Sequence, residues 1–104
     1  MLKPVVLTLL CTAWLPLSAQ AASFGCLDVD TDAESAICAD PELNRMDEDL
    51  ADQYKDVLSQ LSPREARKVR QEQRSWLRAR DSCGDDVRCL RARYEERSAR
   101  LDRY

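Results

Sequence analysis

The fold is predicted mainly from residues 40–65, DPELNRMDEDLADQYKDVLSQLSPRE. They contain one complete helical pattern and the start of a second. Asp40 is a good N-cap, and Pro41 suits the first helical position because its missing N–H would have no intrahelical partner there. Apolar side chains then recur every three or four residues, at Leu43, Met46, Leu50, Tyr54, Val57 and Leu61. This spacing predicts an amphipathic helix that ends near Leu61.

A second helix is predicted directly after the first. Ser62 can cap it, and Glu65, three residues later, can hydrogen-bond back to the Ser62 amide. One side of this helix carries Ala66, Val69, Gln73, Trp76, Leu77, Arg80 and Cys83. Because only a residue or two separates the two helices, we expect them to form an antiparallel hairpin.

A third helix is predicted after a break at Gly84. Gly84 can end the second helix as a C-terminal cap, and Asp85 or Asp86 can cap the next one. Upstream of the hairpin, residues 31–38 begin with two good capping residues and are predicted to form a short helical turn. The predicted fold class is therefore all-α: a small disulfide-linked helical domain with an antiparallel helical hairpin, a third helix and a short N-terminal helical turn.

The first 21 residues have the pattern of a cleavable signal peptide. Lys3 precedes an apolar run over residues 5–17, and Ala19-Gln20-Ala21 places small residues where signal peptidase cleaves. The run is too short for a comfortable membrane span, although an uncleaved anchor is the alternative. We therefore predict a signal peptide at residues 1–21, one domain at residues 22–104, a periplasmic or secreted location and no membrane association after cleavage.

Four cysteines remain after cleavage, Cys26, Cys38, Cys83 and Cys89, and an even number in a short exported chain is typical of disulfides. We predict local pairing, Cys26 with Cys38 and Cys83 with Cys89, while the sequence leaves the other two connectivities open. Six residues of unbroken helix rise about 9 Å, but bonded cysteines have Cα atoms within about 7 Å. The second pair therefore requires a turn. With no histidine and no short CxxC spacing, we predict no metal site and no cofactor.

Charge divides the domain into two halves. Residues 22–61 contain 11 acidic and 2 basic side chains, whereas residues 62–104 contain 13 basic and 8 acidic ones. The arginine-rich half would suit nucleic acid, but the predicted export and the net charge of −3 over the whole chain argue against that partner. We interpret the division as an acidic helix that lies beside a basic one, so that the two neutralise each other.

Two blocks of the sequence resemble one known family. The first block comprises Cys26, residues 34–43, Met46-Asp47, Leu50 and Tyr54, and the second comprises residues 73–83, Cys89-Leu90 and residues 94–97. Together they resemble the LprI-like lysozyme-inhibitor family over nearly all of residues 22–104. The resemblance implies a small, exported, disulfide-linked helical domain and, for at least some members, inhibition of lysozyme. No inhibitory motif of the family is transferred to individual residues of this chain.

Two functions follow as hypotheses. The first is an exported inhibitor that binds and blocks lysozyme and so protects peptidoglycan. The second is a periplasmic structural or adaptor module that binds another envelope protein. We do not expect an enzyme, and predict no catalytic residues, because the chain has no histidine, no nucleophile beside a plausible base and no glycine-rich phosphate loop.

Candidate partner-binding residues come from the acidic half. Lysozymes of the common animal type are basic, so a negatively charged surface is steered towards them. The main candidates are the N-terminal carboxylates, which have few evident internal partners: Asp28, Asp30, Asp32 and Glu34. A second candidate is the ridge Asp47, Glu48, Asp49 and Asp52. The alternative for this ridge is a solvated face, or one that pairs with Arg67, Arg70, Arg74 and Arg78.

Four residues of the second helix are predicted to be structural. Trp76 lies on the apolar side and is expected in the core, and Gln73 on the same side is expected to hydrogen-bond a neighbouring helix. Arg80-Asp81 is expected to tie the hairpin to the third helix. A buried arginine needs a partner, and breaking such a pair costs roughly 3–5 kcal/mol.

Overall fold

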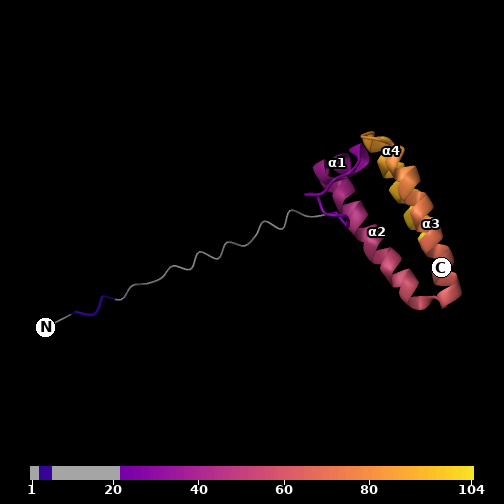
Figure 1. Ribbon diagram of the computed structural model, residues 1–104, viewed down its shortest axis with the longest axis horizontal. Helices are drawn as coiled ribbons and strands as arrows, with labels where there is room; N and C mark the ends of the chain where they lie inside the picture. Colours follow the sequence, from indigo (N-terminus) through magenta and orange to yellow (C-terminus); the bar gives the residue numbers. More distant parts are fainter. Residues whose placement is uncertain (1–2, 6–21) are drawn as a thin grey trace.

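The computed structural model describes residues 3–5 and 22–104, and its folded part is built from helices (Figure 1). This part contains α1 (Asp32–Ala39), α2 (Pro41–Gln60), α3 (Pro63–Asp81) and α4 (Val87–Leu101). None of the described residues forms a strand, so the all-α prediction is confirmed. The predicted signal peptide lies outside the described residues, apart from residues 3–5.

Each of these helices begins at a capping side chain. Thr31 caps α1, Asp40 caps α2, Ser62 caps α3 and Asp86 caps α4, in each case by accepting a hydrogen bond from a backbone N–H two or three residues further on. A short polar side chain at this position satisfies an N–H group that the helix itself leaves unpaired. Local capping therefore explains where the four helices start.

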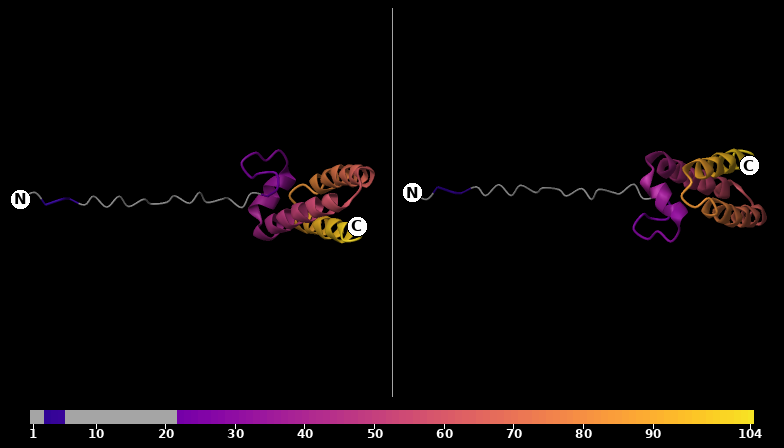
Figure 2. Two further views of the ribbon diagram at one scale, coloured as in Figure 1. Left: turned by 90° about the horizontal axis from the view of Figure 1, so that it is seen from below. Right: turned by 90° about the horizontal axis from the view of Figure 1, so that it is seen from above.

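The helix α4 forms the centre of the bundle. α2 and α3 run in opposite directions through the short connection at residues 61–62, but they make almost no direct contact with each other. α4 packs against both of them, and α1 crosses one end of the bundle and contacts the other three helices (Figures 1 and 2). The hairpin is therefore held together mainly through α4.

The hydrophobic core lies where α4 faces the other helices. Its fully buried side chains include Ile37 of α1, Leu43 of α2, Val69 of α3, and Leu90 and Leu101 of α4. Burial of one such aliphatic side chain contributes roughly 1.5–3 kcal/mol. A core of so few large side chains leaves a substantial part of the stability to polar contacts and disulfides.

Both disulfides have the local pairing that the sequence predicts. Cys26–Cys38 joins the segment before α1 to the end of α1, with Cα atoms 5.8 Å apart. Cys83–Cys89 closes the turn between α3 and α4, with Cα atoms 5.6 Å apart. Gly84 in this turn has a φ of +59°, a left-handed conformation that disfavours residues with a Cβ atom. The chain therefore reverses at Gly84, as the length of an unbroken helix requires.

The acidic helix α2 lies beside a basic helix, but that helix is α4 rather than α3. Apart from one buried contact described below, the ion pairs between helices involve α4, through Arg91–Glu42 at 3.0 Å and Arg97–Glu72 at 3.6 Å. The predicted alternative partners of the acidic ridge, Arg67, Arg70, Arg74 and Arg78, form no ion pair within the described part of the chain. That pairing is therefore wrong, because α2 and α3 scarcely touch.

Candidate functional site

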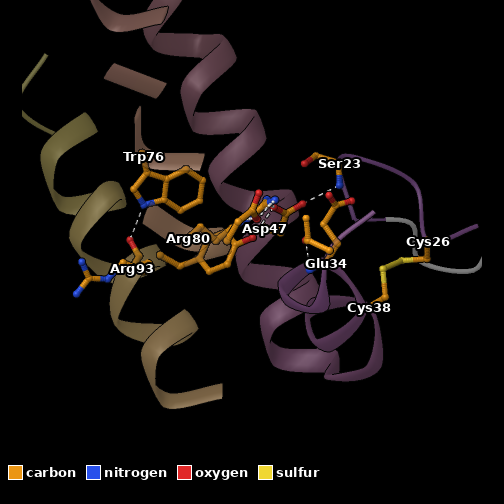
Figure 3. Close-up of polar contacts among 11 residues, drawn as sticks. Ser23, Cys26, Glu34, Cys38, Asp47, Trp76, Arg80 and Arg93 are labelled. Carbon is orange, nitrogen blue, oxygen red and sulfur yellow. Dashed lines mark hydrogen bonds and ion pairs between the residues drawn. A yellow bond between two sulfur atoms is a disulfide. The ribbon is translucent and has the colours of Figure 1, made fainter. Parts of the chain in front are cut away.

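A buried carboxylate joins the helices beneath the N-terminal arm, which we define as residues 22–34 (Figure 3). Asp47 of α2 is only 3% exposed. Its carboxylate accepts hydrogen bonds from the Tyr94 hydroxyl and from the Ser23 backbone N–H, each at 2.7 Å. Arg80 Nη1 lies 3.8 Å from the same carboxylate. One side chain thus connects the arm to α2, α3 and α4.

Arg80 is the cation of this buried network and is 4% exposed. Its Nε and Nη2 donate to Asp81 Oδ1 at 3.0 and 2.8 Å. Its guanidinium lies 5.2 Å from the centre of the Phe24 ring and 5.9 Å from that of Trp76. Because a charge is stable in the interior only when it is paired and hydrogen-bonded, the two aspartates and the two rings make the position of Arg80 possible.

Two aromatic side chains cover the network from α3 and α4. Trp76 packs edge-on against Tyr94 with the ring centres 5.1 Å apart, and its indole N–H donates to the Arg93 carbonyl at 2.9 Å (Figure 3). Burial raises the pKa of Tyr94, and the neighbouring Asp47 carboxylate raises it further. The Tyr94 hydroxyl therefore keeps its proton at neutral pH and donates it in the hydrogen bond to Asp47.

A second polar contact joins α3 to α4. Gln73 Oε1 accepts a hydrogen bond from Arg97 Nε at 2.8 Å. Of the residues that the sequence marks as structural, Gln73 and Trp76 contact α4, and Arg80 reaches Asp47 of α2. Asp81 pairs with the adjacent Arg80, so the expected tie from Arg80-Asp81 to the third helix stays a prediction. Trp76 itself is half-buried and packs against the core.

The arm is anchored at its base before it reaches the surface. Ala22 is buried in the core, and Ser23 makes the hydrogen bond to α2 described above. Gly25 turns the chain with a φ of +75°, and its N–H donates to the Ala22 carbonyl at 2.8 Å. Cys26 is then bonded to the end of α1. Core packing, hydrogen bonds and a disulfide together fix this short segment.

Beyond Cys26, the arm exposes two apolar side chains next to carboxylates. Leu27 is 96% exposed and Val29 is 38% exposed, and both Asp28 and Asp30 are exposed beside them. A partner that covered Leu27 would gain roughly 1.5–3 kcal/mol from its burial. The braced segment therefore offers an apolar contact and negative charge at the same place.

The four predicted partner-binding carboxylates all belong to this arm. Asp28, Asp30 and Asp32 are exposed, and Glu34 is half-buried in the first turn of α1. Their side chains form no ion pair within residues 22–104. The structure therefore brings the four together on one acidic segment whose charge is not neutralised by neighbouring side chains.

The acidic ridge of α2 differs from its prediction at one position. Asp49 and Asp52 are exposed and Glu48 is half-buried, but Asp47 is buried, so its placement on the ridge is wrong. Asp47 follows Leu43 by four residues and therefore falls within the apolar stripe of the helix. This spacing is the signal for its burial. The alternation Leu-Asp-Val-Asp from residue 27 is the only sequence sign of the apolar contact on the arm.

The described residues contain no group of three or more His, Cys, Asp or Glu side chains that could hold a metal ion. No helix among them is both long enough and apolar enough to cross a membrane. The fold and the arm together define a class of protein: a small helical domain that braces a short, exposed, acidic segment with disulfides and a buried polar network.

Comparison with known proteins identifies the family. A family model described as "Lysozyme inhibitor LprI" matches residues 26–103, so the chain belongs to this family. The matched region contains both disulfides, α1 to α4 and residues 26–34 of the arm. Searches of curated proteins and of solved structures found no match.

Proposed function

We propose that this protein is an exported inhibitor that binds lysozyme and so protects peptidoglycan. The observation that carries the proposal is the match to the lysozyme-inhibitor family over residues 26–103. The signal-peptide pattern of residues 1–21 supports export, and the two disulfides suit an oxidising compartment.

The contact surface of the proposed inhibitor is the arm. Its exposed carboxylates attract a basic partner over a distance and so raise the rate of encounter. Leu27 and Val29 would then be covered by the bound enzyme and would slow its dissociation, because buried apolar side chains dominate the energy of protein interfaces. Charge therefore guides the partner, and apolar contact retains it.

The anchoring of the arm supports this role energetically. A flexible segment loses conformational entropy when it binds, at a cost of about 0.5–1.5 kcal/mol for each immobilised side chain in addition to that of the backbone. Here the Ser23–Asp47 hydrogen bond and the Cys26–Cys38 disulfide already restrict the segment on both sides of the turn at Gly25. The free protein thus restrains the base of the arm before a partner binds.

An inhibition assay tests the proposal. The protein is expressed from the full-length chain, recovered with both disulfides formed, and mixed with cell-wall substrate and several types of lysozyme. We expect slower lysis at excess protein, a one-to-one complex with at least one lysozyme type, and weaker inhibition at higher salt. No slowing with any lysozyme type would overturn the proposal.

Paired charge variants locate the contact surface. Asp28→Asn with Asp30→Asn should weaken inhibition by about tenfold, since each exposed charge contact contributes up to about 1 kcal/mol. Asp49→Asn with Asp52→Asn removes the same charge from the exposed ridge of α2 and should change inhibition less than twofold. Equal losses from the two pairs would show that only net charge matters and that the arm is not the contact.

The second candidate is an adaptor that binds another envelope protein. It is favoured by the exposed arginines of α3, Arg67, Arg70, Arg74 and Arg78, which form no ion pair within residues 22–104. Recovery of one defined envelope protein with the oxidised domain, without any effect on lysozyme, would select this function over the first.

A further inference from the structure

A groove with a volume of about 880 Å³ lies between α3 and α4, and none of the residues that line it belongs to the arm. This volume is within the range of about 300–1,000 Å³ that is usual for ligand-binding clefts. Its charged lining residues are Lys68, Glu72, Glu96, Arg97, Arg100 and Arg103, so basic groups outnumber acidic ones. The groove is therefore basic although the chain as a whole is acidic.

Arg97 is a buried cation in this groove that the protein neutralises only in part. It is 3% exposed, and its Nη1 lies 3.6 Å from Glu72 Oε2. The same Glu72 oxygen also accepts a hydrogen bond from the Tyr104 hydroxyl at 2.8 Å. Arg97 Nη2 is buried and has no hydrogen-bond partner among the described residues. Burial lowers the pKa of Arg97, and the Glu72 carboxylate offsets this only partly.

Two exposed arginines continue the basic lining beside Arg97. Arg100 follows three residues along α4, a rise of about 4.5 Å, and Arg103 follows in the turn after the helix. Neither forms an ion pair within residues 22–104. Lys68 faces them across the groove from α3. An extended ligand with several separated negative charges matches this arrangement better than a single small ion.

The two carboxylates of the groove limit the density of negative charge that a bound ligand can carry. Glu72 and Glu96 would repel a strand of nucleic acid, which carries one charge about every 3.4 Å. The same carboxylates can accept hydrogen bonds from hydroxyl groups. Sparse negative charge combined with many hydroxyls is the chemistry of a carbohydrate that carries carboxylates.

The apolar part of the lining argues against a protein partner. It consists of the half-buried Trp76 and the exposed Ala99, and a protein interface requires larger buried anchors. A single aromatic side chain among polar groups instead suits the C–H face of a sugar ring. We propose that the α3–α4 groove binds a polysaccharide strand that bears carboxylate groups, with these groups over Arg97, Arg100 and Arg103.

This activity is separate from the proposed inhibition. The arm carries the negative charge that suits a basic enzyme, whereas the groove carries the positive charge that suits an acidic polysaccharide. A protein with both surfaces would be retained on an acidic polysaccharide while its arm remained available to lysozyme.

A titration with a uronic acid oligosaccharide tests the groove. The protein from the full-length chain, with both disulfides formed, is titrated at low salt with a galacturonic acid hexamer. The methyl-esterified hexamer, whose carboxylates are masked, is the matched control ligand. We expect saturable calorimetric binding of the acid form, a change in Trp76 fluorescence, and at least tenfold weaker binding of the ester.

Two double variants decide whether the groove is responsible. Arg100→Gln with Arg103→Gln should weaken binding about tenfold, whereas Arg67→Gln with Arg70→Gln, which removes equal charge from α3 outside the groove, should change it less than twofold. The proposal is overturned by absent binding, by equal binding of the ester, or by equal losses in the two variants. It is also overturned if a thymidine hexanucleotide binds as tightly with the same dependence on Arg100 and Arg103.

Discussion

The two ends of the helical bundle are held together by different kinds of contact. Both disulfides lie at the α1 end, where Cys26–Cys38 and the buried Asp47–Arg80 network join the four described helices to the arm (Figure 3). The opposite end contains the connection between α2 and α3, and the C-terminus lies near it (Figure 1). The polar contacts towards that end are between more exposed groups, such as Gln53 with Asp102 at 2.7 Å.

This difference shows where a small domain needs its strongest contacts. A disulfide contributes roughly 2–4 kcal/mol, whereas an exposed ion pair contributes about 0–1 kcal/mol. The disulfides and the buried network lie at the α1 end, where the arm exposes Leu27 and carboxylates that form no ion pair within residues 22–104. The end that holds the proposed partner-binding segment is thus the end that is cross-linked.

Removal of the Asp47 carboxylate should give the largest effect. Asp47→Ala leaves Arg80 without one of its two aspartates and leaves the Tyr94 hydroxyl and the Ser23 N–H without an acceptor. We expect the free energy of unfolding, measured by urea denaturation, to fall by roughly 3–5 kcal/mol. If this variant does not fold, Asp47→Asn keeps the shape and should give a smaller loss.

The matched control is Asp52→Ala on the exposed side of the same helix. It removes the same charge and should change the free energy of unfolding by no more than about 0.5 kcal/mol. If Asp47→Ala costs no more than this control, the network does not brace the α1 end.

Most of the fold could be predicted from the sequence because its signals are local. Capping residues at positions 31, 40, 62 and 86 and the glycine at position 84 define the helix boundaries through contacts with their own neighbours in the chain. The central position of α4 could not be predicted this way. It depends on which apolar stripes meet in space, and a short connection between α2 and α3 does not force these helices into close contact.

The site was less predictable than the fold for a related reason. An aspartate on a helix is usually solvated, but a buried hydroxyl, a buried arginine and the Ser23 N–H make Asp47 stable inside. The exposure of Leu27 likewise depends on where the disulfide holds the arm. The spacing of Asp47 from Leu43 indicates its burial, but its partners Tyr94 and Arg80 lie far from it in the sequence, and neither spacing nor composition identifies them.

Removal of each disulfide in turn measures how much each one contributes to the stability of the α1 end of the bundle. The loops that they close contain 13 and 7 residues for Cys26–Cys38 and Cys83–Cys89, respectively. On the chain-entropy model, replacement of each pair by alanine should therefore lower the free energy of unfolding by about 3 and about 2.4 kcal/mol. Backbone amide hydrogen exchange should become faster in the arm when Cys26–Cys38 is removed, and in the α3–α4 turn when Cys83–Cys89 is removed. Equal quickening at the α2–α3 connection would contradict local bracing.

High pH should weaken the braced end through Tyr94. Its pKa is raised in the folded state, so above about pH 10 the unfolded chain loses the Tyr94 proton while the folded chain retains it. The contribution of Tyr94 to the free energy of unfolding is complete below about pH 10. Above that pH it falls by up to about 1.4 kcal/mol per pH unit. Urea denaturation between pH 9 and 11 should show this slope in the wild type and a shallower one in Tyr94→Phe. Equal slopes would show that Tyr94 does not titrate in this way.

Substitution of Leu27 should have the smallest effect on stability but a large effect on binding. This side chain is almost fully exposed, so Leu27→Ser should change the free energy of unfolding by no more than about 0.5 kcal/mol. If the arm contacts lysozyme, the loss of its main apolar group should weaken inhibition about tenfold or more, because burial of a leucine contributes at least about 1.5 kcal/mol. Tyr104→Ser changes an exposed residue at the other end of the bundle and should leave inhibition unaltered. Unaltered inhibition in Leu27→Ser would separate the braced end from the partner and leave its rigidity without a role in binding.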